Sequence, residues 1–306
     1  MSVKLVVANT DEHWLRTLRQ IHNLREVNFW APSAKSFRAL KKGEFFLFKQ
    51  KAPYNRIVGG GIFTYATRLP CSLAWEAFGR GNGAQSLQEM RQRILAYRSR
   101  ASNDRSDFEI GCRILVQPFF FDDVDCIPVP SNWKPNIVTL KTYDTNDAEG
   151  RKLWDSVVDR MRRQPHTIPE KNAVRFGKPT LVQPRLGQGA FRIMVTDNYE
   201  RRCAITRERT LPVLEAAHIR PYSDGGLHQT KNGLLLRSDI HKLFDAGYVT
   251  VTRDLRFEVS KYIKEEFNNG RHYYDLHGVQ IHTPSEVLDR PDPALLEWHN
   301  EQCYKG

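Results

Sequence analysis

The spacing of apolar side chains predicts mixed α and β structure in the first half of the chain. Residues 10–25 carry apolar side chains at every third or fourth position, which predicts a helix with Thr10 as its cap. Residues 44–49 and 56–63 are dense in apolar side chains and a Pro-Tyr-Asn segment separates them, so we expect neighbouring strands joined by a turn. The glycines at 59–61 indicate a bulge or a close backbone approach, because neither a helix start nor a lysine follows them, as a phosphate-binding loop would require.

Two further helices and another strand are expected before residue 164. Ser86 and Glu89 form a capping box that opens a helix. One face of this helix is expected to carry Leu87, Met90, Ile94 and Tyr97. Residues 110–116 have the pattern of a strand, and residues 149–163 that of a helix. The inward side chains of that last helix are expected to be Trp154, Val158 and Met161.

The segment 165–184 has the composition of a linker. Prolines occur repeatedly there among Gly, Lys and Thr, and no hydrophobic period is sustained. The chain is therefore expected to consist of a first domain at 1–164, a linker at 165–184 and a second domain at 185–306.

The second half predicts a strand, a polar loop, a second strand and a helix in succession. The expected elements are a helix at 186–201, strands at 212–219 and 233–236, a helix at 239–246 with Ser238 as its cap, and a hairpin made of 248–251 and 256–259. Both halves together indicate the α+β class.

Composition narrows the class of partner. The 306 residues are 40% hydrophobic and 26% charged, which is typical of a soluble globular protein with room for two domains. The formal net charge is +11, and 26 Lys and Arg stand against 17 Asp and Glu in the first 165 residues, so the first half carries most of an attraction for a polyanion such as nucleic acid. No apolar run approaches the roughly 20 residues of a membrane helix, and no secretory signal is seen. Five cysteines without a CxxC pair indicate reduced thiols in a cytoplasmic protein.

The order strand, loop, strand, helix brings three polar residues into prominence. His218 ends the first strand, Asn232 begins the second, and His241 lies early in the helix. Phosphodiester hydrolysis needs a base that deprotonates water near neutral pH, for which a neutral histidine is suited, and a cation that holds the phosphate. The alternative for each histidine alone is an ordinary hydrogen-bonded residue. The same alternative is favoured for His228, His272, His277 and His282.

The segments around these three residues resemble a known family. Leu214 to Ile219, Asn232 to Leu236 and Asp239 to Asp245, with the upstream run from Arg185 to Arg192, resemble the HNH endonucleases over about residues 185–260. The resemblance implies a ββα-metal fold and a metal-dependent deoxyribonuclease. It further implies His218 as general base, His241 as metal ligand, Asn232 as the tether of the loop, and Arg192 and Lys242 as phosphate contacts. The expected cofactor is Mg²⁺, with Mn²⁺, Co²⁺ and Ni²⁺ as alternatives.

Two positions depart from the family pattern. Many relatives carry a second metal ligand directly before the first histidine, where this chain has Ala217, so Glu215 or Asp239 would have to assist. Many relatives also carry a zinc-binding CxxC pair, of which only Cys203 is present, and no structural zinc is expected.

The first half more loosely resembles the PUA-related group of modified-base readers, which includes the SRA, EVE, ASCH and YTH types. Residues 28–33, 37–49 and 74–83 carry the likeness, and an SRA-like β-barrel with flanking helices is the favoured form. Such a reader flips one base out of the stack and holds it between aromatic faces. The candidates for stacking are Trp30 and Trp75, with Phe29 and Phe78 as alternatives. Those for reading the base edge are Asn28, Ser33 and Asp107. Lys35, Arg38, Lys41, Lys42, Lys49 and Lys51 are candidates for phosphate contact.

Together these features predict a modification-dependent restriction endonuclease of the kind that acts in phage defence. It would recognise 5-methylcytosine or 5-hydroxymethylcytosine in double-stranded DNA and cut nearby, and double-strand cutting would favour a homodimer. One alternative is an HNH nuclease without modification dependence. Another is a non-catalytic reader of modified DNA or RNA, for which the missing ligand at Ala217 is the one support.

Overall fold

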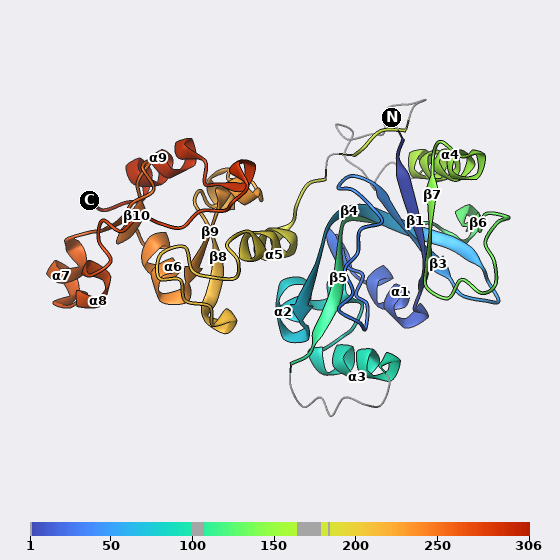
Figure 1. Cartoon of the computed structure of the whole chain (residues 1–306), viewed down its shortest axis with the longest axis horizontal. Helices are drawn as coiled ribbons and strands as arrows, with labels where there is room; N and C mark the ends of the chain where they lie inside the picture. Colours follow the sequence, from blue (N-terminus) through green and yellow to red (C-terminus); the bar gives the residue numbers. More distant parts are fainter. Residues whose placement is uncertain (1, 99–106, 164–178, 183) are drawn as a thin grey trace. The chain divides into compact units, whose positions relative to one another are not determined.

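Residues 2–98, 107–163, 179–182 and 184–306 are described by a computed structural model, in which the chain divides into two units, Met1–Ala190 and Phe191–Gly306 (Figure 1). Most of the expected linker at 165–184 lies outside the described residues. The domain boundaries therefore stay a prediction, and each unit is described by itself.

A mixed sheet forms the centre of the first unit (Figure 1). Its strands are β1 (Lys4–Thr10), β2 (Glu26–Asn28), β3 (Phe45–Gln50), β4 (Arg56–Pro70), β5 (Glu109–Phe120), β6 (Ile127–Pro128) and β7 (Leu140–Asp144). They follow the order β2-β5-β4-β3-β1-β7, with β6 paired to β4. Strands β1 and β3 are parallel, and the other pairs are antiparallel. The strand order has two ends, so closure of the expected barrel is not confirmed within the described residues, whereas the α+β class is.

Helices cover both faces of this sheet. Side chains along a strand point alternately to the two faces, so each face has apolar side chains to bury against a helix. The helices are α1 (Glu12–Arg19), α2 (Cys71–Phe78), α3 (Leu87–Tyr97) and α4 (Ala148–Arg163). Leu5 and Val7 of β1 pack in one core with Trp154 of α4. Val6 of the same strand packs in a second core with Trp14 of α1.

Most elements predicted for the first half are confirmed, including the two strands on either side of residues 53–55 and the helices α3 and α4. The glycine prediction is also confirmed, since a Cβ at Gly59 would lie 2.2 Å from the carbonyl oxygen of Phe119 and the register shifts after Gly60. The cap was wrong: the side chain of Asp11, rather than Thr10, accepts the backbone N–H of Trp14, so the helix begins at Glu12. On the face of α3 expected to be apolar, Met90 and Ile94 are buried, whereas Tyr97 near its end is 52% exposed.

The second unit is built on two antiparallel hairpins. Its strands are β8 (Leu214–His218), β9 (Gly233–Arg237), β10 (Val249–Val251) and β11 (Phe257–Val259). Its helices are α5 (Gln188–Asn198), which begins at the end of the first unit, α6 (Ser238–Asp245), α7 (Tyr262–Phe267), α8 (Arg271–Tyr274) and α9 (Pro293–Gln302). Leu234, Leu236, Phe244 and Leu296 are among the fully buried side chains that join these elements into one core. The predicted order of strand, loop, strand and helix is confirmed, but Ser238 is the first helical residue and not the cap.

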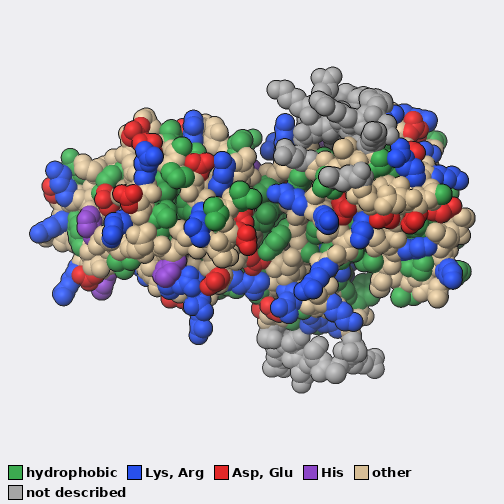
Figure 2. All heavy atoms as spheres, turned by 45° about the horizontal axis from the view of Figure 1, so that its top comes forward, with side chains coloured by type: hydrophobic (Ala, Val, Ile, Leu, Met, Phe, Trp, Pro, Cys, Tyr) green, Lys and Arg blue, Asp and Glu red, His purple; other side chains and the backbone are tan. Residues whose placement is uncertain are grey.

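Basic and acidic side chains are intermingled on the face shown in Figure 2. Within the part of the chain that the structure describes, no helix is both long enough and apolar enough to span a membrane.

Candidate active site

The β8–β9 hairpin places His218 and Asn232 at one end of the two strands. His218 is the last residue of β8 and pairs with Gly233, the first residue of β9. A Cβ at position 233 would lie 2.5 Å from a methyl carbon of Val195 and 3.0 Å from the ring of Phe191. Glycine is therefore required at this position for α5 to pack against the hairpin beside His218.

The His218 ring is half-buried between two aromatic neighbours. It stacks on Phe191, with ring centroids 4.0 Å apart and an interplanar angle of 12°. Its Nε2 lies 3.0 Å from Nδ1 of His228. Burial lowers the pKa of His218 to about 4, with further contributions from His228 and His241. The ring is consequently neutral at neutral pH and able to accept a proton. Since His241 contributes to the lowered pKa of His218, it lies close enough to interact with that ring electrostatically.

Asn232 is a buried clasp at the base of the loop between the two strands. Its side chain is 1% exposed. Its Oδ1 accepts the backbone N–H of Arg220 at 2.9 Å, and its Nδ2 donates to the carbonyl oxygens of Arg220 and Leu227 at 2.9 and 3.0 Å. Donor and acceptor are both engaged by backbone groups, so the Asn232 side chain joins the two ends of the loop, and its part in catalysis stays a prediction.

His241 on α6 lies between two carboxylates. Its Nδ1 is 2.6 Å from Oε2 of Glu215 on β8, and its Nε2 is 3.3 Å from Oδ2 of Asp245, one turn further along α6. Partial burial raises the pKa of Asp245, and the charge of His241 opposes that rise. One imidazole and two carboxylates therefore meet where β8 faces α6.

The two acidic residues predicted to assist in metal binding, Glu215 and Asp239, have different hydrogen-bond partners. Glu215 contacts His241 as described, whereas Asp239 accepts hydrogen bonds from Nε and Nη2 of Arg237 at 2.6 and 2.7 Å and from the hydroxyl of Tyr273 at 3.2 Å. These bonds hold the pKa of Asp239 below its usual range and occupy its oxygens. Asp245 was not named from the sequence, although its spacing of four from His241 on a helix was a signal for it.

The donor set fits a divalent cation by its chemistry, since carboxylate oxygens suit Mg²⁺ and Mn²⁺ and an imidazole nitrogen suits Ni²⁺ and related transition metals. No group of three or more His, Cys, Asp or Glu side chains among the described residues is already arranged around a metal position. Both nitrogens of His241 are instead within hydrogen-bonding distance of the carboxylates, so a cation would displace one of these contacts. Ala217 is fully buried in the core and contributes nothing here.

The two predicted phosphate contacts lie on helices of the second unit. Lys242 is exposed on α6 directly after His241, and Arg192 is half-buried on α5 directly after Phe191. Both positions adjoin residues of the site, and their contact with DNA stays a prediction.

The candidate base-reading residues of the first unit are only partly brought together. Asn28 is fully buried, and its Nδ2 donates to Oδ1 of Asn82 at 2.9 Å. Trp30 is half-buried and its indole N–H donates to the carbonyl oxygen of the same Asn82 at 3.0 Å. The Oδ1 of Asn28 is buried and has no hydrogen-bond partner among the described residues. Asn28 and Trp30 thus converge on one residue.

The other candidates are placed elsewhere in the first unit. Asp107 accepts hydrogen bonds from the backbone and hydroxyl of Ser72 and from Arg91. Trp75 is half-buried on α2, and Ser33 is exposed. Lys49, a candidate for phosphate contact, was wrong: it is 2% exposed and its ammonium group donates to Asn9, Gln50 and Asn55.

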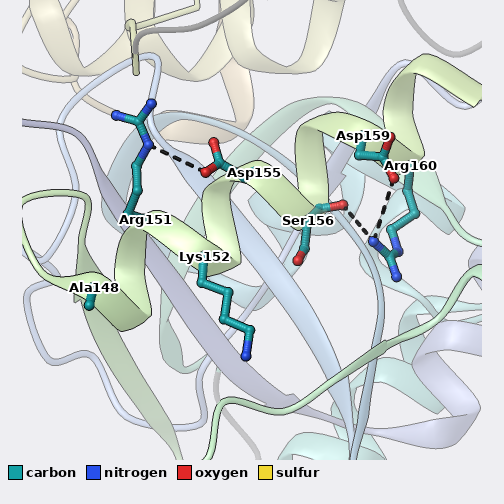
Figure 3. Close-up of a pocket in the computed structure, with 7 residues that line it drawn as sticks. All are labelled: Ala148, Arg151, Lys152, Asp155, Ser156, Asp159 and Arg160. Carbon is teal, nitrogen blue, oxygen red and sulfur yellow. Dashed lines mark hydrogen bonds and ion pairs between the residues drawn. The ribbon is translucent and has the colours of Figure 1, made fainter.

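A shallow hollow in the first unit lies along α4 (Figure 3). Arg151 pairs with Asp155 at 3.4 Å, and Arg160 donates to the carbonyl oxygen of Ser156 at 3.3 Å. The hollow contains none of the predicted site residues, and its lining is that of a solvated helix face with paired charges.

Comparison with known proteins gives a family match for part of the second unit. Residues 203–252 match the family model described as HNH endonuclease, so the resemblance inferred from the motif is confirmed there. The chain has no match among curated proteins. Among solved structures it is similar to ASCH from Zymomonas mobilis, at 12% identity over 50% of this chain and 94% of that chain with a TM-score of 0.34. It is also similar to the modification-dependent TagI restriction endonuclease, at 14% identity over 99% of this chain and 81% of that chain with a TM-score of 0.29. With TM-scores this low, neither likeness determines the fold or the activity of this chain.

Proposed function

Starting from the HNH endonuclease region at residues 203–252, we propose that this chain is a metal-dependent deoxyribonuclease whose cutting depends on a modified base. The observation that carries the proposal is the state of His218. Its ring is neutral at neutral pH, and one of its nitrogens, Nδ1, has no partner among the described residues, while His241 and two carboxylates lie nearby.

His218 is the general base of the proposed reaction. Its Nδ1 takes a proton from a water molecule, the water oxygen attacks phosphorus, and the bond from phosphorus to the leaving oxygen breaks. The leaving oxygen then takes a proton from solvent. General-base catalysis of this kind contributes about 10²–10⁴-fold.

The residues proposed to hold the cation are His241, Glu215 and Asp245. When bound, a divalent cation would stabilise negative charge on the phosphate and on the leaving oxygen. Asn232 keeps the loop after His218 closed, and Lys242 and Arg192 bind phosphate oxygens. Each of these tasks belongs to a different side chain, so each can be removed separately.

The first unit is proposed to select the target, which we take to be 5-methylcytosine or 5-hydroxymethylcytosine in double-stranded DNA. The excess of basic over acidic residues in the first half supports binding to DNA. The unpartnered Oδ1 of Asn28 supports recognition of a base, because a buried acceptor without a donor costs about 1–3 kcal/mol and a cytosine amino group would supply the donor. Trp30 beside it is proposed as the stacking surface.

The test is cleavage of three copies of one plasmid, which carry cytosine, 5-methylcytosine or 5-hydroxymethylcytosine. Wild-type protein with Mg²⁺ is expected to cut one or both modified copies and to spare the unmodified copy, and chelation of the metal is expected to stop the reaction. Equal cutting of all three would reject the dependence on modification and keep the nuclease. Absence of cutting with Mg²⁺, Mn²⁺, Co²⁺ and Ni²⁺ would reject the nuclease.

A further inference from the structure

A second histidine, His228, contacts the proposed general base. It lies in the loop between β8 and β9, and its Nδ1 is 3.0 Å from Nε2 of His218. Its ring stacks on Tyr222, with centroids 5.0 Å apart and an interplanar angle of 5°. Both rings of the pair are therefore held in place by aromatic neighbours, His218 by Phe191 and His228 by Tyr222.

The direction of the hydrogen bond between the two rings decides what His218 can do. A neutral imidazole carries one N–H, and its other nitrogen is an acceptor. If His218 donates from Nε2, its Nδ1 keeps a lone pair and can take a proton from water. If His228 is the donor, the single proton of a neutral His218 sits on Nδ1, and that nitrogen cannot act as a base.

The backbone around His228 is fixed by the same residue that closes the loop. The carbonyl oxygen of Leu227 accepts from Nδ2 of Asn232 at 3.0 Å, and the carbonyl oxygen of Gln229 accepts from the backbone N–H of Asn232 at 2.9 Å. Asn232 therefore holds the residues on both sides of His228. The clasp positions the His228 ring against His218 as well as closing the loop.

We propose that His228 is a positioning residue that fixes the catalytic tautomer of His218. It accepts the Nε2–H of His218 and so leaves the Nδ1 lone pair for the water. This inference rests on the proposed function, in which His218 is the base. It assigns to a loop histidine the orienting task that a carboxylate performs in other histidine-based sites.

A pair of substitutions separates this role from simple packing. In His228→Asn, the amide oxygen occupies about the place of Nδ1 and still accepts a hydrogen bond. In His228→Leu, a side chain with the same branching offers no acceptor. Both remove the stacked ring, so a difference between them reports the hydrogen bond.

Two measurements on wild type and both variants test the proposal. The ¹⁵N chemical shifts of the His218 ring report which nitrogen carries the proton, and cleavage of modified DNA with Mg²⁺ reports catalysis. Wild type is expected to show the Nε2–H tautomer. His228→Asn is expected to keep that tautomer and cleave within about threefold of wild type. His228→Leu is expected to lose the preference and fall about 10–100-fold in kcat with KM unchanged, the usual cost of removing an orienting partner.

Three results would overturn the inference: an Nδ1–H tautomer of His218 in wild type, the same tautomer in His228→Leu as in wild type, or undiminished cleavage by His228→Leu. Thermal unfolding of both variants verifies that they are folded. If wild type cuts no DNA, the ¹⁵N measurement still decides whether His228 sets the tautomer, so failure of the proposed function is distinguished from failure of this inference.

Discussion

Two histidines of the second unit have a similarly lowered pKa and differ in their hydrogen-bond partners. Burial lowers the pKa of both His218 and His299 to about 4. Each ring also stacks on a phenylalanine, His218 on Phe191 at 4.0 Å and His299 on Phe244 at 3.7 Å. By these two criteria the sites cannot be told apart.

They differ in what remains unsatisfied. His299 on α9 is 2% exposed, its Nδ1 lies 2.8 Å from the Thr250 hydroxyl, and its Nε2 lies 3.1 Å from the carbonyl oxygen of Phe244. Both of its nitrogens are thus used by the protein. His218 is half-buried and uses one nitrogen, towards His228. A lowered pKa indicates burial in both cases. Of these four ring nitrogens, Nδ1 of His218 has no partner among the described residues, which is what the proposed general base requires.

The largest expected difference lies in cleavage after removal of His218. His218→Ala is expected to slow cleavage of modified DNA about 10²–10⁴-fold, because the base is lost. DNA binding and the folded structure are expected to persist. Single-turnover cleavage measures the effect, and His282→Ala, the same change at an exposed histidine, serves as the control. Cleavage by His218→Ala at the rate of that control would remove His218 from the mechanism.

The next difference lies in stability after replacement of His299. His299→Phe keeps an aromatic ring against Phe244 but loses both hydrogen bonds of the imidazole, to the Phe244 carbonyl oxygen and to the Thr250 hydroxyl, which is expected to lower the free energy of unfolding by about 1–3 kcal/mol. Urea denaturation measures this loss. Cleavage per folded molecule is expected to be unchanged, and a rate that falls as it does in His218→Ala would break the comparison.

Lowering the pH is expected to lower the free energy of unfolding through the same buried histidines. The folded-state pKa of about 4 lies below the unfolded value of about 6.5, so the unfolded state binds protons first as the pH falls. The stabilisation is present above pH 6.5 and is lost as the pH falls towards 4. For the sealed His299 the slope is at most about 1.4 kcal/mol per pH unit. The free energy of unfolding, measured in urea between pH 7 and 4.5, is expected to fall less steeply in His299→Phe than in wild type. Parallel pH curves would show that His299 does not contribute.

The smallest difference concerns affinity for DNA. Lys242→Ala, beside His241, is expected to weaken binding about threefold and to reduce the salt slope of log Kd by about 1, because one phosphate contact is lost. Lys305→Ala is the control. This lysine lies over the ring of Tyr248, just before β10, and is not among the residues predicted to contact phosphate. Equal salt slopes for the two variants would remove Lys242 from the DNA contact.

The order of elements in the second unit could be predicted from the sequence, because it depends on local spacing. The hydrophobic period identified β8, β9 and α6, and their order led to the choice of His218, Asn232 and His241 as central residues, which stays a prediction. The capping residues of the helices could be predicted less well from the sequence. Thr10 and Asp11 are adjacent residues of the capping type, and only the folded backbone shows that the Asp11 carboxylate reaches Trp14.

The contacts missed from the sequence are those that depend on loop conformation or on packing between elements. His228 was interpreted as an ordinary loop residue, because no period describes a loop and the turn that brings it to His218 is set by hydrogen bonds to Asn232. Lys49 was one of six basic residues predicted to contact phosphate. The sequence does not show that its side chain turns inward to the amide oxygens of Asn9 and Asn55.

The clasp formed by Asn232 has a consequence for the evolution and engineering of such a chain. Because one side chain joins both backbone groups of Arg220, the loop above it is closed at its root. Residues inserted between Ser223 and Asp224 would interrupt the short turn Tyr222–Asp224, whose Tyr222 ring stacks on His228. The bonds from Asn232 to Arg220 and Leu227 would still join the two ends of the loop, so an insertion there is expected to displace His228 before it displaces the strands β8 and β9.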